Sequence, residues 1–312
     1  MTGGPLIAIL GPTAVGKTAL AVALAQALDT DIVSGDSMLV YRGFDIGTAK
    51  PSAVERGGVA HALIDICDPS EPFSVSDFQR LATERIAAIQ ARRRIPVLAG
   101  GTGIYVKALL EGYVFSEAKE DTAYRREMEA LAEEKGRAYV HDLLAAADPE
   151  AAARIPESNL RRVIRALEVC RGGRETISRA KAGGLVYDAL VIGLRRERRS
   201  LYERIDKRVD AMMAAGLVDE VRGLLAAGVS RDAPAMKGIG YKEMAAHLAG
   251  ETTLDEAVAA VKRATRRFAK RQFTWYRSMP YIRWLDVDGV PLSELREKVL
   301  REAAGFFPEM TN

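Results

Sequence analysis

The stretch PLIAILGPTAVGKTALAVALAQAL, residues 5–28, decides how this chain folds. Its centre, GPTAVGKT at residues 11–18, stands between an apolar run typical of a strand, residues 5–10, and a helical pattern, residues 17–28. Glycines spaced in this way let the backbone curl so that its N–H groups point at phosphate oxygens, and the start of the helix adds positive potential. The motif therefore predicts a phosphate-binding loop.

Each part of this loop has an expected role beside a di- or triphosphate. Lys17 supplies a positive charge, and the hydroxyl of Thr18 is expected to bind Mg²⁺, the one cofactor we expect. The motif is typical of nucleotide-binding and ATP-binding proteins, and by itself it leaves the reaction open. The residues expected to hold the phosphates are Gly11, Pro12, Thr13, Ala14, Val15, Gly16, Lys17 and Thr18.

The organisation around the loop predicts an α/β protein. Strand-like runs at residues 31–37 and 95–101 flank a helical pattern at residues 76–92, which favours a parallel sheet covered by helices. We expect a P-loop NTPase-like core with an inserted all-helical subdomain. The core comprises residues 1–118 and 187–312, and the insertion comprises residues 119–186, where helix starts are predicted at Asp121, at Asp148 with Pro149, and at Ser158.

Composition excludes several classes of protein. Hydrophobic residues make up 48% of the 312 residues and charged residues 28%, and no apolar run is long enough to span a bilayer. The N-terminus lacks the basic start of a signal peptide, so we expect a cytoplasmic protein without membrane contact. A monomer is the default expectation. Two distant cysteines, Cys67 and Cys170, support neither a disulfide framework nor a zinc site.

An acid follows the second predicted strand. Phosphate-loop hydrolases usually have a metal-binding acid at the end of a further strand, but the run at residues 95–103 ends in GGTG. Asp36, in SGDSMLVY, instead stands at the end of the next predicted strand after the loop. Its position suits a base that acts on an acceptor.

A basic stripe runs through the C-terminal part. No acidic residue occurs from Ala257 to Leu285. On a helical wheel one side carries Val261, Thr265, Phe268, Gln272 and Trp275, and the other side carries Lys262, Arg263, Arg266, Arg267, Lys270 and Arg277. One sign of charge over four turns indicates binding of a polyanion. A small-metabolite kinase would explain the loop and Asp36 but not this stripe.

Several motifs together resemble one family. GPTAVGKT, SGDSMLVYRGFDIGTAKP, HALIDICDPSEPFSVSDF, PVLAGGTGIY, NLRRVIRALEV, GIGYKE and RRFAKRQFTWYR are similar to motifs of the bacterial tRNA dimethylallyltransferases, also called isopentenyl-tRNA transferases. The resemblance covers residues 6–285. It implies transfer of a dimethylallyl group from dimethylallyl diphosphate to the exocyclic amine of the adenosine 3′ to the anticodon, with release of diphosphate and help from Mg²⁺.

The resemblance also implies residue roles. Asp36 would be the general base, Lys17 and Thr102 would be catalytic residues beside the diphosphate, and Arg208 would bind the leaving group. The insertion and the core would hold the anticodon stem-loop, with the target base turned out of its stack. The residues expected to bind tRNA are Asp36, Ser37, Met38, Leu39, Thr102, Tyr124, Asn159, Leu160, Arg161, Arg162, Val163, Arg165, Arg266, Arg267, Lys270 and Arg271.

Two positions depart from the family pattern. Leu39 replaces a glutamine, so a polar contact to a base edge is lost there, and Ala62 replaces a second histidine after His61, a site that we interpret as structural. A relative that prenylates free adenine nucleotides shares the loop and the acid, but it needs no basic stripe. A non-catalytic RNA-binding protein would need no base at Asp36.

Overall fold

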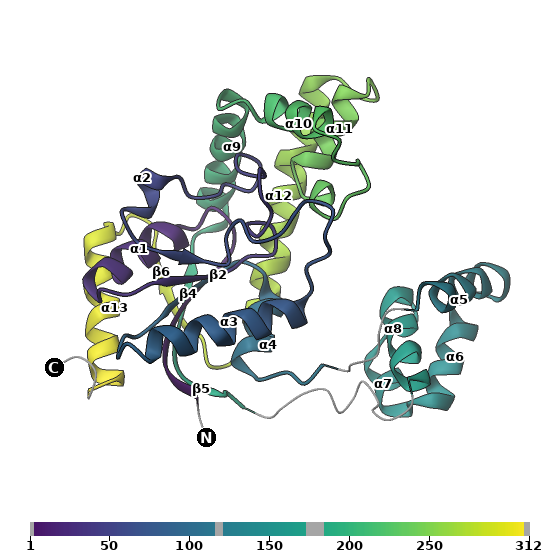
Figure 1. The fold of residues 1–312 in the computed structure, drawn as a ribbon, viewed down its shortest axis with the longest axis horizontal. Coiled ribbons are helices and arrows are strands. Elements are labelled where there is room, and N and C mark those ends of the chain that lie inside the picture. The colour runs from purple at the N-terminus through teal and green to yellow at the C-terminus, as the bar shows by residue number, and fades with distance from the viewer. Residues whose placement is uncertain (1–2, 116–120, 173–183, 309–312) are drawn as a thin grey trace. The chain divides into compact units, whose positions relative to one another are not determined.

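The computed structural model describes residues 3–115, 121–172 and 184–308, and these form two compact units (Figure 1). The first unit comprises Met1–Leu110 and Leu185–Asn312, and the second comprises Glu111–Gly184. The sequence predicts the same order of parts, with boundaries at 118/119 and 186/187. The earlier of these predicted boundaries lies outside the described residues.

A six-stranded parallel sheet forms the centre of the first unit, in the order β3-β2-β4-β1-β5-β6. The predicted strands 5–10, 31–37 and 95–101 are found, with the latter two shorter than expected; the sequence did not predict β3 or β6. The strands within the described residues are β1 Gly3–Leu10, β2 Ile32–Gly35, β3 His61–Ala62, β4 Val97–Gly100, β5 Tyr187–Arg195 and β6 Arg283–Asp286.

Helices cover both faces of this sheet (Figure 1). Residues of α3 and α4 pack on one face, and residues of α1 and α13 pack on the other. The helices described in this unit are α1 Lys17–Ala27, α2 Ala53–Arg56, α3 Val75–Gln90, α4 Gly103–Leu110, α9 Arg198–Ala214, α10 Leu217–Ala226, α11 Tyr241–Leu248, α12 Leu254–Arg277 and α13 Leu292–Phe306, with a short 3₁₀ turn at Ala235–Lys237.

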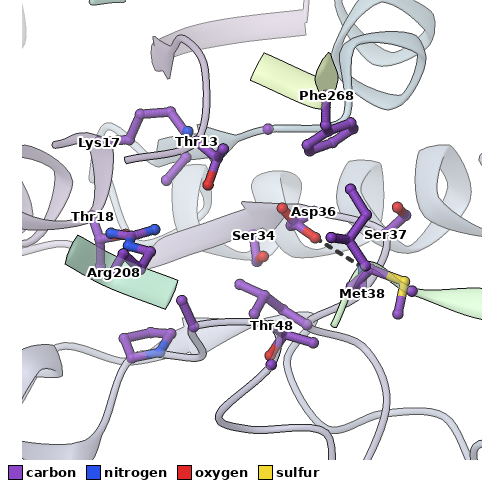
Figure 2. Close-up of a pocket in the computed structure, with 18 of the residues that line it drawn as sticks. Thr13, Lys17, Thr18, Ser34, Asp36, Ser37, Met38, Thr48, Arg208 and Phe268 are labelled. Carbon is purple, nitrogen blue, oxygen red and sulfur yellow. Dashed lines mark hydrogen bonds between the residues drawn. The ribbon is translucent and has the colours of Figure 1, made fainter. Parts of the chain in front are cut away.

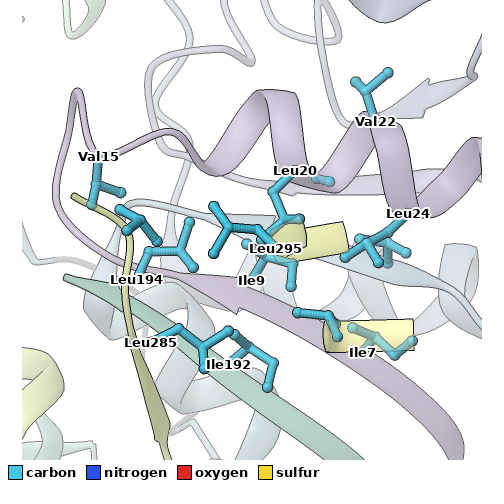
Figure 3. Packing of buried hydrophobic residues seen from close by; sticks show 14 of the residues in the cluster. Ile7, Ile9, Val15, Leu20, Val22, Leu24, Ile192, Leu194, Leu285 and Leu295 are labelled. Atoms are coloured by element: carbon cyan, nitrogen blue, oxygen red, sulfur yellow. The ribbon is translucent and has the colours of Figure 1, made fainter. Parts of the chain in front are cut away.

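Strand β1 is buried on both sides because it lies in the middle of the sheet. Ile7 and Ile9 pack toward α1 and α13, together with Leu20 and Leu295 (Figure 3). The alternate residues of the strand point to the opposite face, where α3 and α4 lie. A continuous apolar run is therefore the pattern expected of this strand.

The sheet brings three loops to one edge. β1, β4 and β2 are neighbours, with Leu10 in register with Gly100, and Gly100 in register with Gly35. The chain leaves all three parallel strands at the same end, which is where ligands bind in open α/β sheets. The phosphate-binding loop, Asp36 and Thr102 therefore start from adjacent positions.

The second unit is entirely helical within its described residues. Its helices are α5 Thr122–Lys135, α6 Arg137–Ala147, α7 Pro149–Arg154 and α8 Leu160–Arg171. The Asp121 side chain caps α5, and the Asp148 side chain caps α7, which has Pro149 in its first turn, as predicted. α8 starts two residues after the predicted Ser158, and α6 was not predicted separately.

None of the described helices is both long and apolar enough to cross a membrane.

Candidate active site

One cavity in the first unit collects most of the predicted catalytic residues (Figure 2). Lys17 and Thr18 line it from the start of α1, Asp36 lines it after β2, and Arg208 lines it from α9. Thr13, at the edge of the phosphate-binding loop, lies beside Lys17 (Figure 2). The structure therefore places a phosphate-binding loop and a carboxylate on the walls of the same cavity.

Glycines give the loop its shape. Gly11 has a φ of 144°, and a Cβ there would stand 2.7 Å from the carbonyl oxygen of Leu194 on β5. Gly16 has a φ of 116° at the N-terminal cap of α1. Side chains disfavour both conformations, so these two positions require glycine. The loop consequently wraps around the positive end of α1, as the motif predicts.

The ammonium group of Lys17 lies over the loop and donates a hydrogen bond to the carbonyl oxygen of Pro12 at 2.8 Å. Burial lowers the pKa of Lys17 from 10.5 to about 8, Asp36 opposes that change, and Arg208 adds to it. An anion bound between Lys17 and Arg208 would favour the charged lysine. The cavity is therefore built for a ligand that brings negative charge.

Two arginines that the sequence did not predict donate hydrogen bonds to backbone carbonyls of the same loop. Arg204 on α9 donates to the carbonyl oxygen of Ala14 at 3.0 Å, and Arg196 donates to that of Val15 at 3.2 Å. These two contacts fix the orientation of the Ala14 and Val15 carbonyl groups in the loop. Neither Arg196, which lies between β5 and α9, nor Arg204, which lies within α9, carries a local signal of such a contact, so only the fold identifies them.

A hydrogen-bonded turn holds Asp36. Its Oδ1 accepts from the backbone N–H of Met38 at 2.9 Å (Figure 2). The hydroxyl of Thr102 accepts from the N–H of Ser37 at 2.9 Å and donates to the Ser37 hydroxyl at 3.1 Å. Thr102 thus fixes the turn that carries Asp36, a contact the sequence did not predict. Its expected contact with a diphosphate stays a prediction.

The rest of the cavity wall is largely apolar. Met38, after Asp36, and Phe268, on α12, line it (Figure 2). Leu39 and, from α9, Met212 also line it. Because Leu39 lines this wall, its departure from the family glutamine makes the cavity less polar. The sequence did not predict the lining residues Thr48, Met212 or Ile239, although Thr48 and Ile239 lie within two of the motifs that resemble the family.

The predicted division of α12 into two sides is confirmed for most positions. Val261, Thr265, Phe268 and Gln272 line the cavity. Trp275 is 40% exposed instead. The apolar side of α12 therefore forms a wall of the cavity.

The basic side of α12 is partly neutralised. Lys262 and Arg266 form ion pairs with Asp210 and Asp206 of α9, at 2.5 Å and 2.7 Å. The sequence did not predict these two ion pairs, because their acids come from another helix, α9. In the described part of the chain, Arg263, Arg267, Lys270 and Arg271 are exposed and have no carboxylate within ion-pair distance.

Residues of the second unit require a correction. Val163 is fully buried among Val140 and Leu144, so its side chain packs the helical core and cannot contact RNA. Arg165 pairs with Glu168 at 2.6 Å, and Leu160 packs against the same core. The side chains of α8 that stay exposed are those of Arg161 and Arg162, among others.

Tyr124 and Asn159 lie at the starts of two helices of this unit. The amide of Tyr124 is capped by Asp121, and the guanidinium of Arg171 lies 4.7 Å from the centre of the Tyr124 ring. Asn159 is the N-terminal cap residue of α8, although its side chain makes no capping hydrogen bond. The Asn159 amide group therefore remains available for a contact outside the helix.

Comparisons with known proteins show the family of this chain. A family model described as IPP transferase matches residues 39–279, and one described as isopentenyl transferase matches residues 4–69. The tRNA dimethylallyltransferase of Geobacillus thermodenitrificans is 48% identical over 304 residues, which cover 96% of each chain.

Solved structures extend the likeness to the fold. The full-length tRNA isopentenylpyrophosphate transferase of Bacillus halodurans is 46% identical, with a TM-score of 0.75 and coverage of 98% of both chains. A eukaryotic dimethylallyltransferase described as acting on tRNA is 26% identical, with a TM-score of 0.80, over 97% of this chain and 78% of that one. The sheet, the phosphate-binding loop and the relatives lead to one conclusion: the chain belongs to the IPP transferase family.

Proposed function

We propose that this protein is a tRNA dimethylallyltransferase. It transfers a dimethylallyl group from dimethylallyl diphosphate to the exocyclic amine of the adenosine 3′ to the anticodon, and it releases diphosphate. The observation that carries the proposal is the single cavity in which Lys17, Thr18 and Arg208 lie opposite Asp36. The transfer needs groups that hold the donor diphosphate and a base that acts on the acceptor amine, both within reach of the carbon atom that is transferred.

The donor would be held through its diphosphate. The Lys17 ammonium and the Arg208 guanidinium are positive groups that line the cavity, and backbone amides of the loop would add further donors. Negative charge grows on the diphosphate as its bond to carbon breaks, and fixed donors stabilise it at no cost of reorganisation. The apolar wall of Met38, Leu39 and Phe268 suits the dimethylallyl chain.

Magnesium fits this arrangement as a partner of the diphosphate. Among the described residues, no group of three or more His, Cys, Asp or Glu side chains could hold a metal. Mg²⁺ typically keeps several waters and binds through one or two protein oxygens and substrate phosphates. Thr18, exposed at the cavity, would supply a hydroxyl, and the ion would neutralise charge on the leaving diphosphate.

Asp36 would act on the acceptor. In the transfer, the adenine nitrogen forms a bond to the first carbon of the dimethylallyl group, the bond from that carbon to oxygen breaks, and one proton leaves the nitrogen. Asp36 would accept this proton through its Oδ2, and the N–H of Met38, which donates to Oδ1, supports this role. An adenine amine is a weak nucleophile because its lone pair is delocalised, so a base in contact with it promotes the reaction.

The acceptor would be held by basic side chains. Arg263, Arg267, Lys270 and Arg271 lie exposed on α12, and the second unit adds Arg161 and Arg162 on α8. Phosphate contacts of this kind position an RNA without reading its sequence. We expect the protein to work as a cytoplasmic monomer, because one chain contains all of these groups.

Incubation of the purified protein with dimethylallyl diphosphate, Mg²⁺ and unmodified tRNA tests the proposal. Nucleoside mass analysis should find prenylated adenosine next to the anticodon. Free AMP, ADP and ATP serve as competing acceptors, and ATP without prenyl donor serves as the control for a kinase. Prenylation of free nucleotides alone, or phosphorylation of an acceptor, would contradict it.

A further inference from the structure

Gln272 is a buried polar side chain in the middle of the basic helix α12. It is only 5% exposed. Its Oε1 accepts a hydrogen bond from the backbone N–H of Thr13 at 2.9 Å, and its Nε2 donates to the carbonyl oxygen of Gly101 at 2.6 Å. One side chain therefore joins the phosphate-binding loop to the loop that follows β4.

The two partners fix the chemistry of this position. The N–H of Thr13 can only donate and the carbonyl of Gly101 can only accept, so the connecting group must accept at one end and donate at the other. A neutral carboxamide does both, whereas a carboxylate only accepts and an ammonium only donates. Glutamine also has the length to reach both loops from α12.

Gly101 lies where the reacting groups converge. A Cβ on Gly101 would stand 3.0 Å from Oδ2 of Asp36, 3.2 Å from Nε2 of Gln272 and 4.0 Å from the ammonium nitrogen of Lys17. The carboxamide therefore lies beside the proposed base and the phosphate-binding lysine. The next residue, Thr102, hydrogen-bonds to the turn that carries Asp36.

One turn further along α12, a second contact reaches the same strand end. The hydroxyl of Tyr276 donates to the carbonyl oxygen of Gly100 at 3.2 Å, and Tyr276 is fully buried. This contact does not involve the phosphate-binding loop. Gln272 is thus the α12 side chain, among the described hydrogen bonds, that reaches both loops.

We propose that Gln272 is a positioning residue that sets the phosphate-binding loop and the Asp36 turn at the spacing that transfer requires. Through Thr13 it orients the loop that holds the leaving group, and through Gly101 it supports Thr102 and thereby Asp36. Its role in transfer rests on the proposed function. Its role in shaping the phosphate-binding loop does not, because that loop can be tested with diphosphate alone.

The substitution Gln272→Met removes both hydrogen bonds and keeps an unbranched side chain of similar length. We expect the single-turnover rate of prenyl transfer to fall about 10- to 100-fold, since a buried N–H and a buried carbonyl lose their partner beside the reacting groups. Calorimetry with Mg²⁺ and inorganic diphosphate should show about tenfold weaker binding. Affinity for tRNA, measured by fluorescence anisotropy, should stay within about twofold.

Two matched variants on the same helix separate positioning from general damage to α12. Tyr276→Phe removes a contact to Gly100 only, and diphosphate affinity should not change. Thr274→Ala alters an exposed residue whose hydroxyl bonds to Lys270 within the helix, and all three measurements should match the wild type. The melting temperature of each variant shows whether the fold persists.

The outcomes are distinguishable. Wild-type rate and diphosphate affinity in Gln272→Met would overturn the inference, and so would a loss of tRNA affinity as large as the loss of rate. If the wild-type protein prenylates no tRNA, the proposed function fails. The calorimetric comparison still decides whether Gln272 shapes the phosphate-binding loop.

Discussion

The carboxylate of Glu220 on α10 holds one wall of the cavity in place, and its removal gives a sharp test of how that wall is built. Its oxygens accept hydrogen bonds from the N–H groups of Asp45, Ile46 and Gly47, at 3.1, 2.7 and 3.2 Å, and from the hydroxyl of Tyr241 at 2.7 Å. Gly47 lines the cavity. The substitution Glu220→Gln replaces one accepting oxygen by an NH₂ group, which then faces donors.

The structure sets the size of the effect. Each oxygen of Glu220 serves two donors, so the glutamine loses two of the four hydrogen bonds. Burial and the nearby carboxylate raise the pKa of Tyr241, which therefore stays a donor. A hydrogen bond to a charged group contributes about 1.5–3 kcal/mol, and part of this loop is solvated, so we expect a local loss of about 2–4 kcal/mol.

Hydrogen exchange measures this loss directly. In peptides that contain residues 45–47, the protection factor against hydrogen exchange should fall roughly 30- to 1000-fold, the equivalent of about 2–4 kcal/mol. The KM for the prenyl donor should also rise. Glu203→Gln is the matched control, because Glu203 pairs with Arg199 on the surface, where ion pairs contribute about 0–1 kcal/mol. Unchanged exchange at residues 45–47 in Glu220→Gln would refute the reasoning.

Three further predictions concern the charged groups of the site. The pKa of Lys17 is about 8, and a bound diphosphate would raise it. Calorimetry with an unreactive thiolo analogue of the donor should therefore give constant affinity below about pH 8 and a fall in affinity of up to about tenfold per pH unit above it. Lys17→Arg should remove this fall, and a fall that persists in Lys17→Arg would exclude lysine as its source. Asp36→Ala should lower turnover about 10²–10⁴-fold while tRNA affinity holds, and unchanged turnover would remove Asp36 from the mechanism. In the double variant Arg267→Ala/Lys270→Ala, the slope of the logarithm of tRNA affinity against the logarithm of salt concentration should become about 1.5 units shallower. Lys262→Ala should change this slope less, because Lys262 is already paired with Asp210. Equal slopes in all variants would place the RNA elsewhere.

Local patterns predicted the catalytic edge of the sheet well. The glycines at 11 and 16 take backbone conformations that favour glycine, and the continuous apolar run of β1 is typical of a central strand, so the loop could be predicted from sequence alone. Asp36 could be found because it directly follows strand β2, which ends at the same edge of the sheet as that loop. The helix starts at Asp121 and Asp148 were readable because capping is a contact between residues three apart.

Contacts between distant segments could not be predicted in the same way. Gln272 is 259 residues from its partner Thr13, and nothing near it in sequence marks that contact. Lys262 seemed uncompensated because Asp210 lies on another helix. Val163, within a basic cluster, seemed available to RNA until the packing of four helices buried it.

The central claim is that Asp36 and the phosphate-binding loop together prenylate tRNA. Mass analysis of anticodon loops, from cells that lack this protein and cells that regain the wild type or Asp36→Ala, tests it most directly. The account predicts that the prenyl group on the adenosine 3′ to the anticodon disappears without the protein. It predicts that the wild type restores the modification and Asp36→Ala does not. Persistence of the modification in cells that lack the protein, or its full restoration by Asp36→Ala, would contradict the account.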